Sequence, residues 1–141
     1  MKSLNTLRTN LNDPMSTLLS RIWVFLSLNY IFCDVLSNME MSVLQMLLEG
    51  SVGGVEMTQG MLLFAGLSLE IPFVMILLTT ILAYKANRIT NMVAAVLMIA
   101  YQAASFLFGS DVTLHYAFFS TIEILGNLVI LVLAIRWKQS L

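Results

Sequence analysis

Long apolar runs fill most of this chain, and short polar segments separate them. The runs cover about residues 22–38, 60–84, 89–108 and 115–135. Each run has roughly the 17 to 25 residues that an α-helix needs to cross the hydrocarbon core of a bilayer. The pattern therefore predicts an all-α fold, an integral membrane bundle of four spanning helices.

The start of the first helix is marked by Asp13 and Pro14. Asp is a favoured N-cap residue, and Pro is favoured at the first helical position. We expect this helix to continue through Arg21 into the first span. Residues 1–20 are then an N-terminal segment, and residues 21–138 form a single four-span domain.

The connections between the predicted spans differ in length and composition. In the long connection 39–59, residues 41–48 are apolar enough for a short helix in the membrane interface, and Gly53 and Gly54 permit a tight turn. A basic turn is predicted at residues 85–88, and a polar turn at 109–114.

Charge distribution adds an orientation to this arrangement. The chain is 59% hydrophobic and 11% charged, with a mean hydropathy of +0.88, which excludes an ordinary soluble domain. Its basic residues fall in three short segments, and cytoplasmic loops are enriched in Lys and Arg. Both termini should therefore be cytoplasmic, with connections 39–59 and 109–114 outside. The basic residues are Lys2, Arg8, Arg21, Lys85, Arg88, Arg136 and Lys138.

Polar residues in each predicted span fall on one helical face at 100° per residue. We expect these faces to turn inward, away from lipid. They contain Asn29, Tyr30, Cys33, Asp34 and Ser37 in the first span; Gln59, Gly66 and Glu70 in the second; Asn91, Met98, Gln102, Ser105 and Gly109 in the third; and Tyr116, Ser120, Glu123 and Asn127 in the fourth.

Two glutamates, Glu70 and Glu123, are the strongest candidates for chemistry. Both lie roughly 10 to 15 Å below the outer ends of their spans, at a depth that Asn29 and Gln102 share. We expect the two carboxyl groups to meet as the floor of an outward-facing pocket, above an inner half of mostly Leu, Ile, Val and Ala. The predicted ligand-binding residues are Glu70, Glu123, Asn29, Gln102, Asp34, Tyr30, Asn127 and His115, with Asp34 and His115 at the rim.

A carboxyl group at this depth costs about 2.5 to 3.5 kcal/mol on insertion scales. No Lys or Arg lies within the apolar runs, so each acid must carry a proton, share one, or hold a cation. Pro72 is expected to kink its helix and to free the carbonyl of Ser68 as a further ligand. The alternative is a neutral hydrogen-bonded cluster that only fixes helix register.

Other chemistries receive less support. The methionines near the outer surface, such as Met57 and Met61, would suit Cu(I), but methionine is also an ordinary filler of apolar helices. His115 lies at a helix start and fits a pocket rim better than a metal site. The single cysteine, Cys33, excludes an intrachain disulfide. We expect no catalytic residue, no cofactor and no metal ligand.

Several short motifs stand out: Asn29-Tyr30-x-x-Cys33-Asp34, Gly50-x-x-Gly53-Gly54-x-x-x-Thr58-Gln59-Gly60, Glu70-Ile71-Pro72, Ala86-Asn87-Arg88 and Phe119-Ser120-x-x-Glu123. Together they resemble a known bacterial family of small four-span inner-membrane proteins of unknown function. The resemblance covers roughly residues 20–138 and implies an inner-membrane location, but it brings no activity. A looser likeness to the DoxX-type membrane proteins concerns the fold alone.

Two functions follow from this reading. The first is a non-enzymatic protein whose acidic pocket binds or transports a proton, a small cation or a small polar or cationic molecule. The second is a non-catalytic accessory subunit of a membrane assembly. The partners that we consider are the lipid bilayer, the small ligand and further copies of the chain; nucleic acid is excluded.

Overall fold

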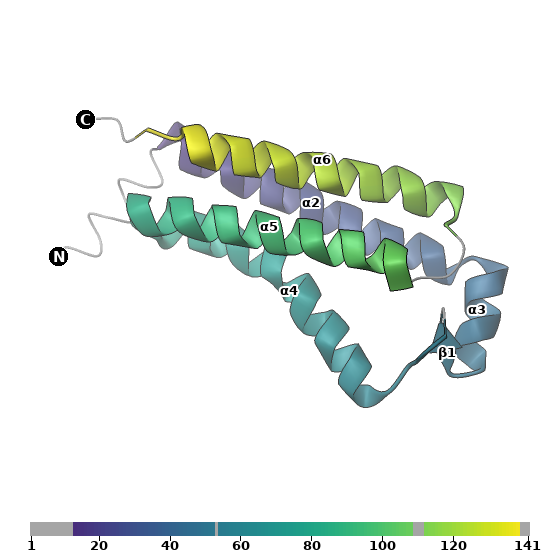
Figure 1. Ribbon diagram of the computed structural model, residues 1–141. Helices are drawn as coiled ribbons and strands as arrows, with labels where there is room; N and C mark the ends of the chain where they lie inside the picture. The colour runs from purple at the N-terminus through teal and green to yellow at the C-terminus, as the bar shows by residue number, and fades with distance from the viewer. Residues whose placement is uncertain (1–12, 53, 109–111, 139–141) are drawn as a thin grey trace.

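Four long helices make up most of the protein in a computed structural model that describes residues 13–52, 54–108 and 112–138 (Figure 1). They are α2 (Pro14–Asn38), α4 (Gln59–Ile81), α5 (Tyr84–Phe108) and α6 (Leu114–Arg136). Each is long and apolar enough to cross a membrane. The prediction of an all-α chain with four candidate spans is confirmed.

The first helix begins where the sequence indicates. The Asp13 carboxylate accepts a hydrogen bond from the backbone N–H of Met15 at 3.0 Å, and Pro14 is the first residue of α2. The proline lacks an N–H, so the first turn leaves one fewer donor unsatisfied. Residues 109–111 of the turn predicted at 109–114, and the first 12 residues, lie outside the described chain.

The long connection contains more structure than the sequence pattern predicts. The helix expected at residues 41–48 is present as α3 (Met41–Leu48). A two-stranded antiparallel hairpin follows it, with β1 (Ser51–Val52) paired to β2 (Val55–Glu56). Gly50 and Gly54 both have positive φ angles, of 81° and 79°, which side chains disfavour. Gly53 lies outside the described residues.

The predicted boundary between the second and third spans is wrong. Helix α4 ends at Ile81 rather than at residue 84, and α5 already begins at Tyr84. The expected basic turn at residues 85–88 is therefore the first turn of α5, and the link is only Leu82 and Ala83. Arg88 and Tyr84 in this turn donate hydrogen bonds to backbone carbonyls at the end of α6, contacts that the sequence pattern does not contain.

Helix packing is close at one end of the bundle and looser at the other. Helix α2 packs against α4 and α6, and α5 packs against α6 and, to a lesser degree, α4. Helix α4 changes direction along its length, and its first half diverges from α5 and α6 (Figure 1). Pro72 lies inside this helix and removes one backbone hydrogen bond, which accounts for the bend.

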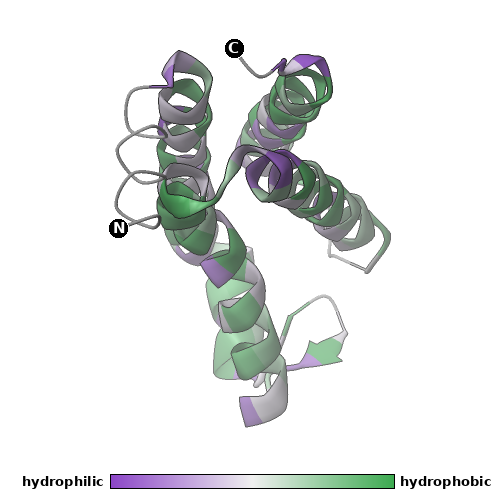
Figure 2. Ribbon diagram, turned by 90° about the vertical axis from the view of Figure 1, so that its left-hand side faces the viewer, coloured by the Kyte–Doolittle hydropathy of each residue, from purple (hydrophilic) through white to green (hydrophobic). Residues whose placement is uncertain are grey.

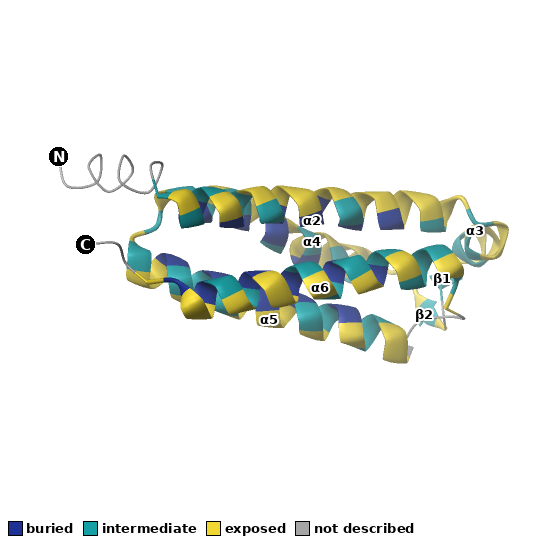
Figure 3. Cartoon of the chain, turned by 90° about the horizontal axis from the view of Figure 1, so that it is seen from above, coloured by how far each residue is buried: buried dark blue, intermediate teal, exposed yellow. Residues whose placement is uncertain are grey.

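The tightly packed end also carries the basic residues, and we call it the basic end. It is defined by Arg21, Lys85, Arg88, Arg136 and Lys138. Figure 2 views the bundle from this end, with hydrophilic segments at the helix termini and largely apolar helix flanks. Figure 3 shows the buried positions on the faces that the helices turn toward each other. Exposed apolar flanks on long helices are what a lipid environment permits.

Candidate functional site

Helix α6 presents one continuous polar face to the bundle interior. Ser120, Glu123 and Asn127 lie one turn apart on this face, and each is 1% exposed or less. Tyr116 precedes them and is half-buried. The inward face predicted for the fourth span is thus confirmed. We call the set Tyr30, Gln102, Ser120, Glu123 and Asn127 the Glu123 cluster.

Helix α5 contributes Gln102, which bonds across to α6. Its side-chain nitrogen donates to the Ser120 hydroxyl at 2.6 Å and lies 3.4 Å from the Tyr116 hydroxyl. Ser105 donates to the carbonyl of Gln102 at 2.6 Å and also hydrogen-bonds the Tyr116 hydroxyl. Asn91, Met98 and Gln102 are buried, which confirms the inward face predicted for the third span as far as the structure describes it.

Helix α2 contributes Tyr30, which joins the cluster through Asn127. The Asn127 amide nitrogen donates to the Tyr30 hydroxyl at 2.8 Å and to the backbone carbonyl of Glu123 at 2.8 Å. Both amide protons are thereby used. Tyr30 itself is 5% exposed, so this contact is shielded from the surroundings of the bundle.

Two acceptor oxygens in this cluster have no hydrogen-bond partner. They are Oε1 of Glu123 and Oδ1 of Asn127, and both are fully buried. A buried acceptor without a donor costs about 1 to 3 kcal/mol. The two residues are four positions apart on one helix, which places their side chains one above the other. The arrangement favours a bound group that donates hydrogen bonds or carries positive charge.

The site holds few groups that could bind a metal ion. No three His, Cys, Asp or Glu side chains come together as a metal site in the part of the chain that the structure describes. Mg²⁺ and Ca²⁺ prefer six or more oxygen ligands, which a single carboxyl group and an amide do not supply.

At the end of the bundle opposite the basic end, His115 at the start of α6 contacts residues near the end of α2. Its Nε2 lies 3.2 Å from the Ser37 hydroxyl of α2, and its Nδ1 lies 3.2 Å from the Thr113 hydroxyl. The same Nδ1 is 4.0 Å from Glu40 Oε2. The residue therefore closes the junction between α2 and α6, which is compatible with the predicted position at a rim.

The predicted meeting of Glu70 and Glu123 is wrong. Glu70 is exposed on α4, as are Gln59 and Gly66, so the polar face predicted for the second span points outward. The buried residues of α4 are Ser68, Pro72, Met75 and Thr79. Glu70 follows Ser68 by two positions, or 200° around the helix, which carries it to nearly the opposite side.

Two residues of α2 that were predicted in the site lie outside the buried face of the bundle. Asp34 is exposed, and half-buried Asn29 donates its amide to the carbonyl of Phe25 in its own helix at 2.8 Å. The buried face of α2 runs instead through Trp23, Leu26 and Tyr30, with Cys33 above them. Consecutive residues are 100° apart around a helix, so the predicted face was too wide and included Asn29, next to Tyr30, and Asp34, next to Cys33.

A second polar network, at the basic end, was not predicted. The Asn91 amide donates to Asn87 Oδ1 at 2.8 Å, and its oxygen accepts from the Trp23 indole at 2.7 Å. Asn87 in turn donates to the backbone carbonyl of Thr79 at 2.6 Å. The same carbonyl accepts a hydrogen bond from the Ser16 hydroxyl at 2.5 Å. The inner half of the bundle is thus not purely apolar. Its buried amides have partners, which indicates a structural role.

Comparison with known proteins gives a family but no activity. A model of a family of unknown function, DUF6326, matches residues 9–141. The chain belongs to this family. Neither a curated protein nor a solved structure matches it significantly, so the looser likeness to DoxX-type proteins has no support here.

Proposed function

We propose that this membrane protein binds a proton or a small monovalent cation at the Glu123 cluster. The observation that carries the proposal is the pair of buried, unpartnered acceptors, Oε1 of Glu123 and Oδ1 of Asn127. A cation or a protonated group between these oxygens would satisfy both. Tyr30 and Gln102 hold the surrounding side chains in place through their bonds to α6.

The charge of the chain supports a positive ligand. The apolar spans contain no Lys or Arg near Glu123, so no side-chain cation neutralises it. At the end opposite the basic one, Glu40, Glu49 and Glu56 lie in the connection between α2 and α4. Clustered carboxylates raise the local concentration of cations by their field. An approach from this end is therefore electrostatically favourable.

The proposed cellular setting follows from the basic residues. We place the protein in the bacterial inner membrane with both termini in the cytoplasm, because basic segments remain on that side. Glu123 then lies nearer the outer end of α6 than its cytoplasmic end. Binding there is the first step that either uptake or sensing of the cation requires.

The proposal can be tested by thermal unfolding of the purified protein in detergent. The wild type is measured across acid to neutral pH and with Li⁺, Na⁺, K⁺ and NH₄⁺ chlorides at equal ionic strength. A specific ligand present at 100 times its Kd stabilises by about 2.7 kcal/mol. Glu123→Gln should lose this response while it keeps the fold, because Gln nearly matches Glu in shape.

Glu70→Gln is the matched control, since it removes the same charge from the same kind of helix at an exposed position. It should respond to cations as the wild type does. A flat response in all three proteins, or an equal response in Glu123→Gln, would refute the proposal.

One observation favours the second function, an accessory subunit. Glu70 lines an apolar groove between α4 and α5, about 300 Å³ in volume, with Leu67, Val74 and Val93 around it. A carboxyl group in contact with lipid costs about 2.5 to 3.5 kcal/mol, and a polar partner helix would offset this. A larger complex in mild detergent that Glu70→Leu dissociates would support this function.

A further inference from the structure

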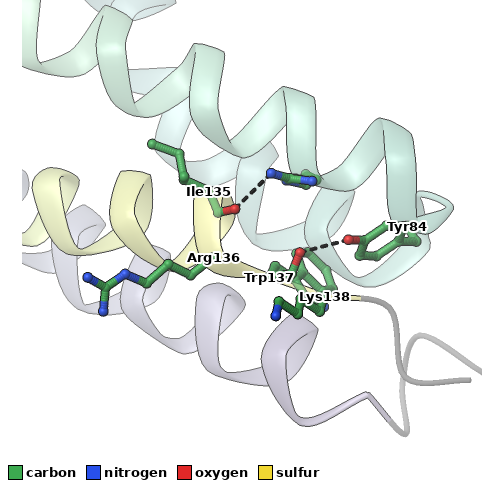
Figure 4. A pocket seen from close by; sticks show the side chains of 6 residues that line it. Tyr84, Ile135, Arg136, Trp137 and Lys138 are labelled. Carbon is green, nitrogen blue, oxygen red and sulfur yellow. Dashed lines mark hydrogen bonds between the residues drawn. The ribbon is translucent and has the colours of Figure 1, made fainter.

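An open groove lies at the basic end of the bundle, far from the Glu123 cluster. It encloses about 630 Å³ between the first turn of α5 and the end of α6. Figure 4 shows its side chains, with Tyr84 and Trp137 together on one side and Arg136 extending on the other. The lining residues are Tyr84, Arg88, Ile135, Arg136, Trp137 and Lys138.

Hydrogen bonds to the end of α6 hold the walls of this groove in place. Arg88 donates from Nε to the carbonyl of Ala134 at 2.8 Å and from Nη2 to that of Ile135 at 2.7 Å. Tyr84 donates to the carbonyl of Trp137 at 2.7 Å, and the two rings meet edge to face with centroids 5.3 Å apart. The terminal carbonyls of a helix otherwise have no intrahelical donor. The groove is therefore fixed before any ligand binds.

Among the residues that the structure describes, the positive charges along the groove have no acidic partner within 4.0 Å. The ion pair found within 4.0 Å among the described residues joins His115 and Glu40, at the other end of the bundle. Arg88, Arg136 and Lys138 thus bring three uncompensated cations to one concave surface. Unused guanidinium N–H groups of Arg88 remain after its two bonds to α6.

We propose that this groove binds the phosphate of an anionic phospholipid headgroup. Arginine recognises phosphate through its planar fork of donors, and basic pockets between spanning helices suit lipid headgroups. Tyr84 and Trp137 are the residue types that lie at the headgroup level of a membrane. Ile135 lines the groove and is 51% exposed, and Val132, about one turn before it, is 45% exposed; acyl chains would cover both.

Binding is tested with the full-length protein in a neutral detergent. Its thermal unfolding is followed while short-chain phosphatidylglycerol, short-chain phosphatidylcholine or inorganic phosphate is added. The test variant is the double substitution Arg136→Gln with Lys138→Gln. The control is Arg21→Gln with Lys85→Gln, which removes two exposed cations from the same end but outside the groove.

Phosphatidylglycerol should stabilise the wild type, whereas phosphatidylcholine should not. The groove variant should bind it about 30-fold more weakly, from the usual contribution of two cations near an anionic headgroup. The control should lose less than about threefold, because distant exposed charges are screened. Equal losses in the two double variants would mean diffuse surface charge and would overturn the proposal. Equal stabilisation by inorganic phosphate would overturn the assignment to lipid.

Discussion

The contact between α2 and α6 rests on a glycine, and its replacement should measure how closely these helices pack. A Cβ atom added at Gly126 would lie 2.5 Å from Cδ2 and 3.2 Å from Cγ of Leu26. Leu26 is fully buried, so its side chain cannot move aside without displacing other core residues. Small residues at such crossings allow helix backbones to approach closely in membranes.

The size of the effect can be worked out from two opposing terms. Overpacking of a core costs about 1 to 3 kcal/mol. The better helix propensity of Ala returns about 1 kcal/mol. We therefore expect Gly126→Ala to lower the free energy of unfolding by up to about 2 kcal/mol.

Gly66→Ala provides the matched control, because no atom lies within 4 Å of its added Cβ. It should gain about 0.5 to 1 kcal/mol. Both variants are measured by reversible unfolding in mixed micelles, with helix content followed by circular dichroism. If Gly126→Ala were as stable as Gly66→Ala, the close approach of α2 and α6 would be refuted.

Three further predictions concern the basic end and the orientation. Asn91→Leu leaves the Trp23 indole without its acceptor and should lower the free energy of unfolding by about 1 to 2 kcal/mol; an unchanged value would exclude a stabilising role for the network. Arg88→Lys keeps the charge but cannot span two carbonyls, so it should be less stable than wild type, by about 1 kcal/mol, in the same assay. A Lys variant of full stability would contradict the bridging role. In a cysteine-free background, Ser51→Cys should react with a membrane-impermeant thiol reagent from outside and Ala86→Cys should not; the reverse labelling would overturn the orientation.

Sequence periodicity predicted the helices that carry the clearest polar faces. The inward faces of α5 and α6 are read correctly from Gln102, Ser120 and Glu123, because polar residues recur at helical spacing along these faces. The start of α2 was also predictable, since Asp13 and Pro14 are strong local signals. Such signals depend only on residues that are close in sequence, so they can be read without knowledge of the fold.

The face of α4 could not be assigned in the same way. Its polar residues are few, and the prediction was based on Glu70, whereas the smaller residues Ser68 and Thr79 are the ones that face inward. A carboxyl group is expensive in lipid, but α4, which contains Pro72, bends so that its first half leaves the bundle. The orientation is therefore set by tertiary geometry that periodicity does not contain.

The Asn87–Asn91 network was missed for a different reason. The sequence reading placed Asn87 in a turn, although the two asparagines four residues apart match one helical face. Their partner Trp23 is 68 positions from Asn91 in the chain. No local pattern identifies such a pair.

The most direct test of a cation or proton site at Glu123 is infrared difference spectroscopy of the carboxyl groups. The spectrum is recorded in lipid before and after the stabilising cation is added, for wild type, Glu123→Gln and Glu70→Gln. We expect a change in the carboxyl band of wild type and Glu70→Gln that is absent from Glu123→Gln. A band change that persists in Glu123→Gln, or its absence from the wild type, would contradict a ligand site at Glu123.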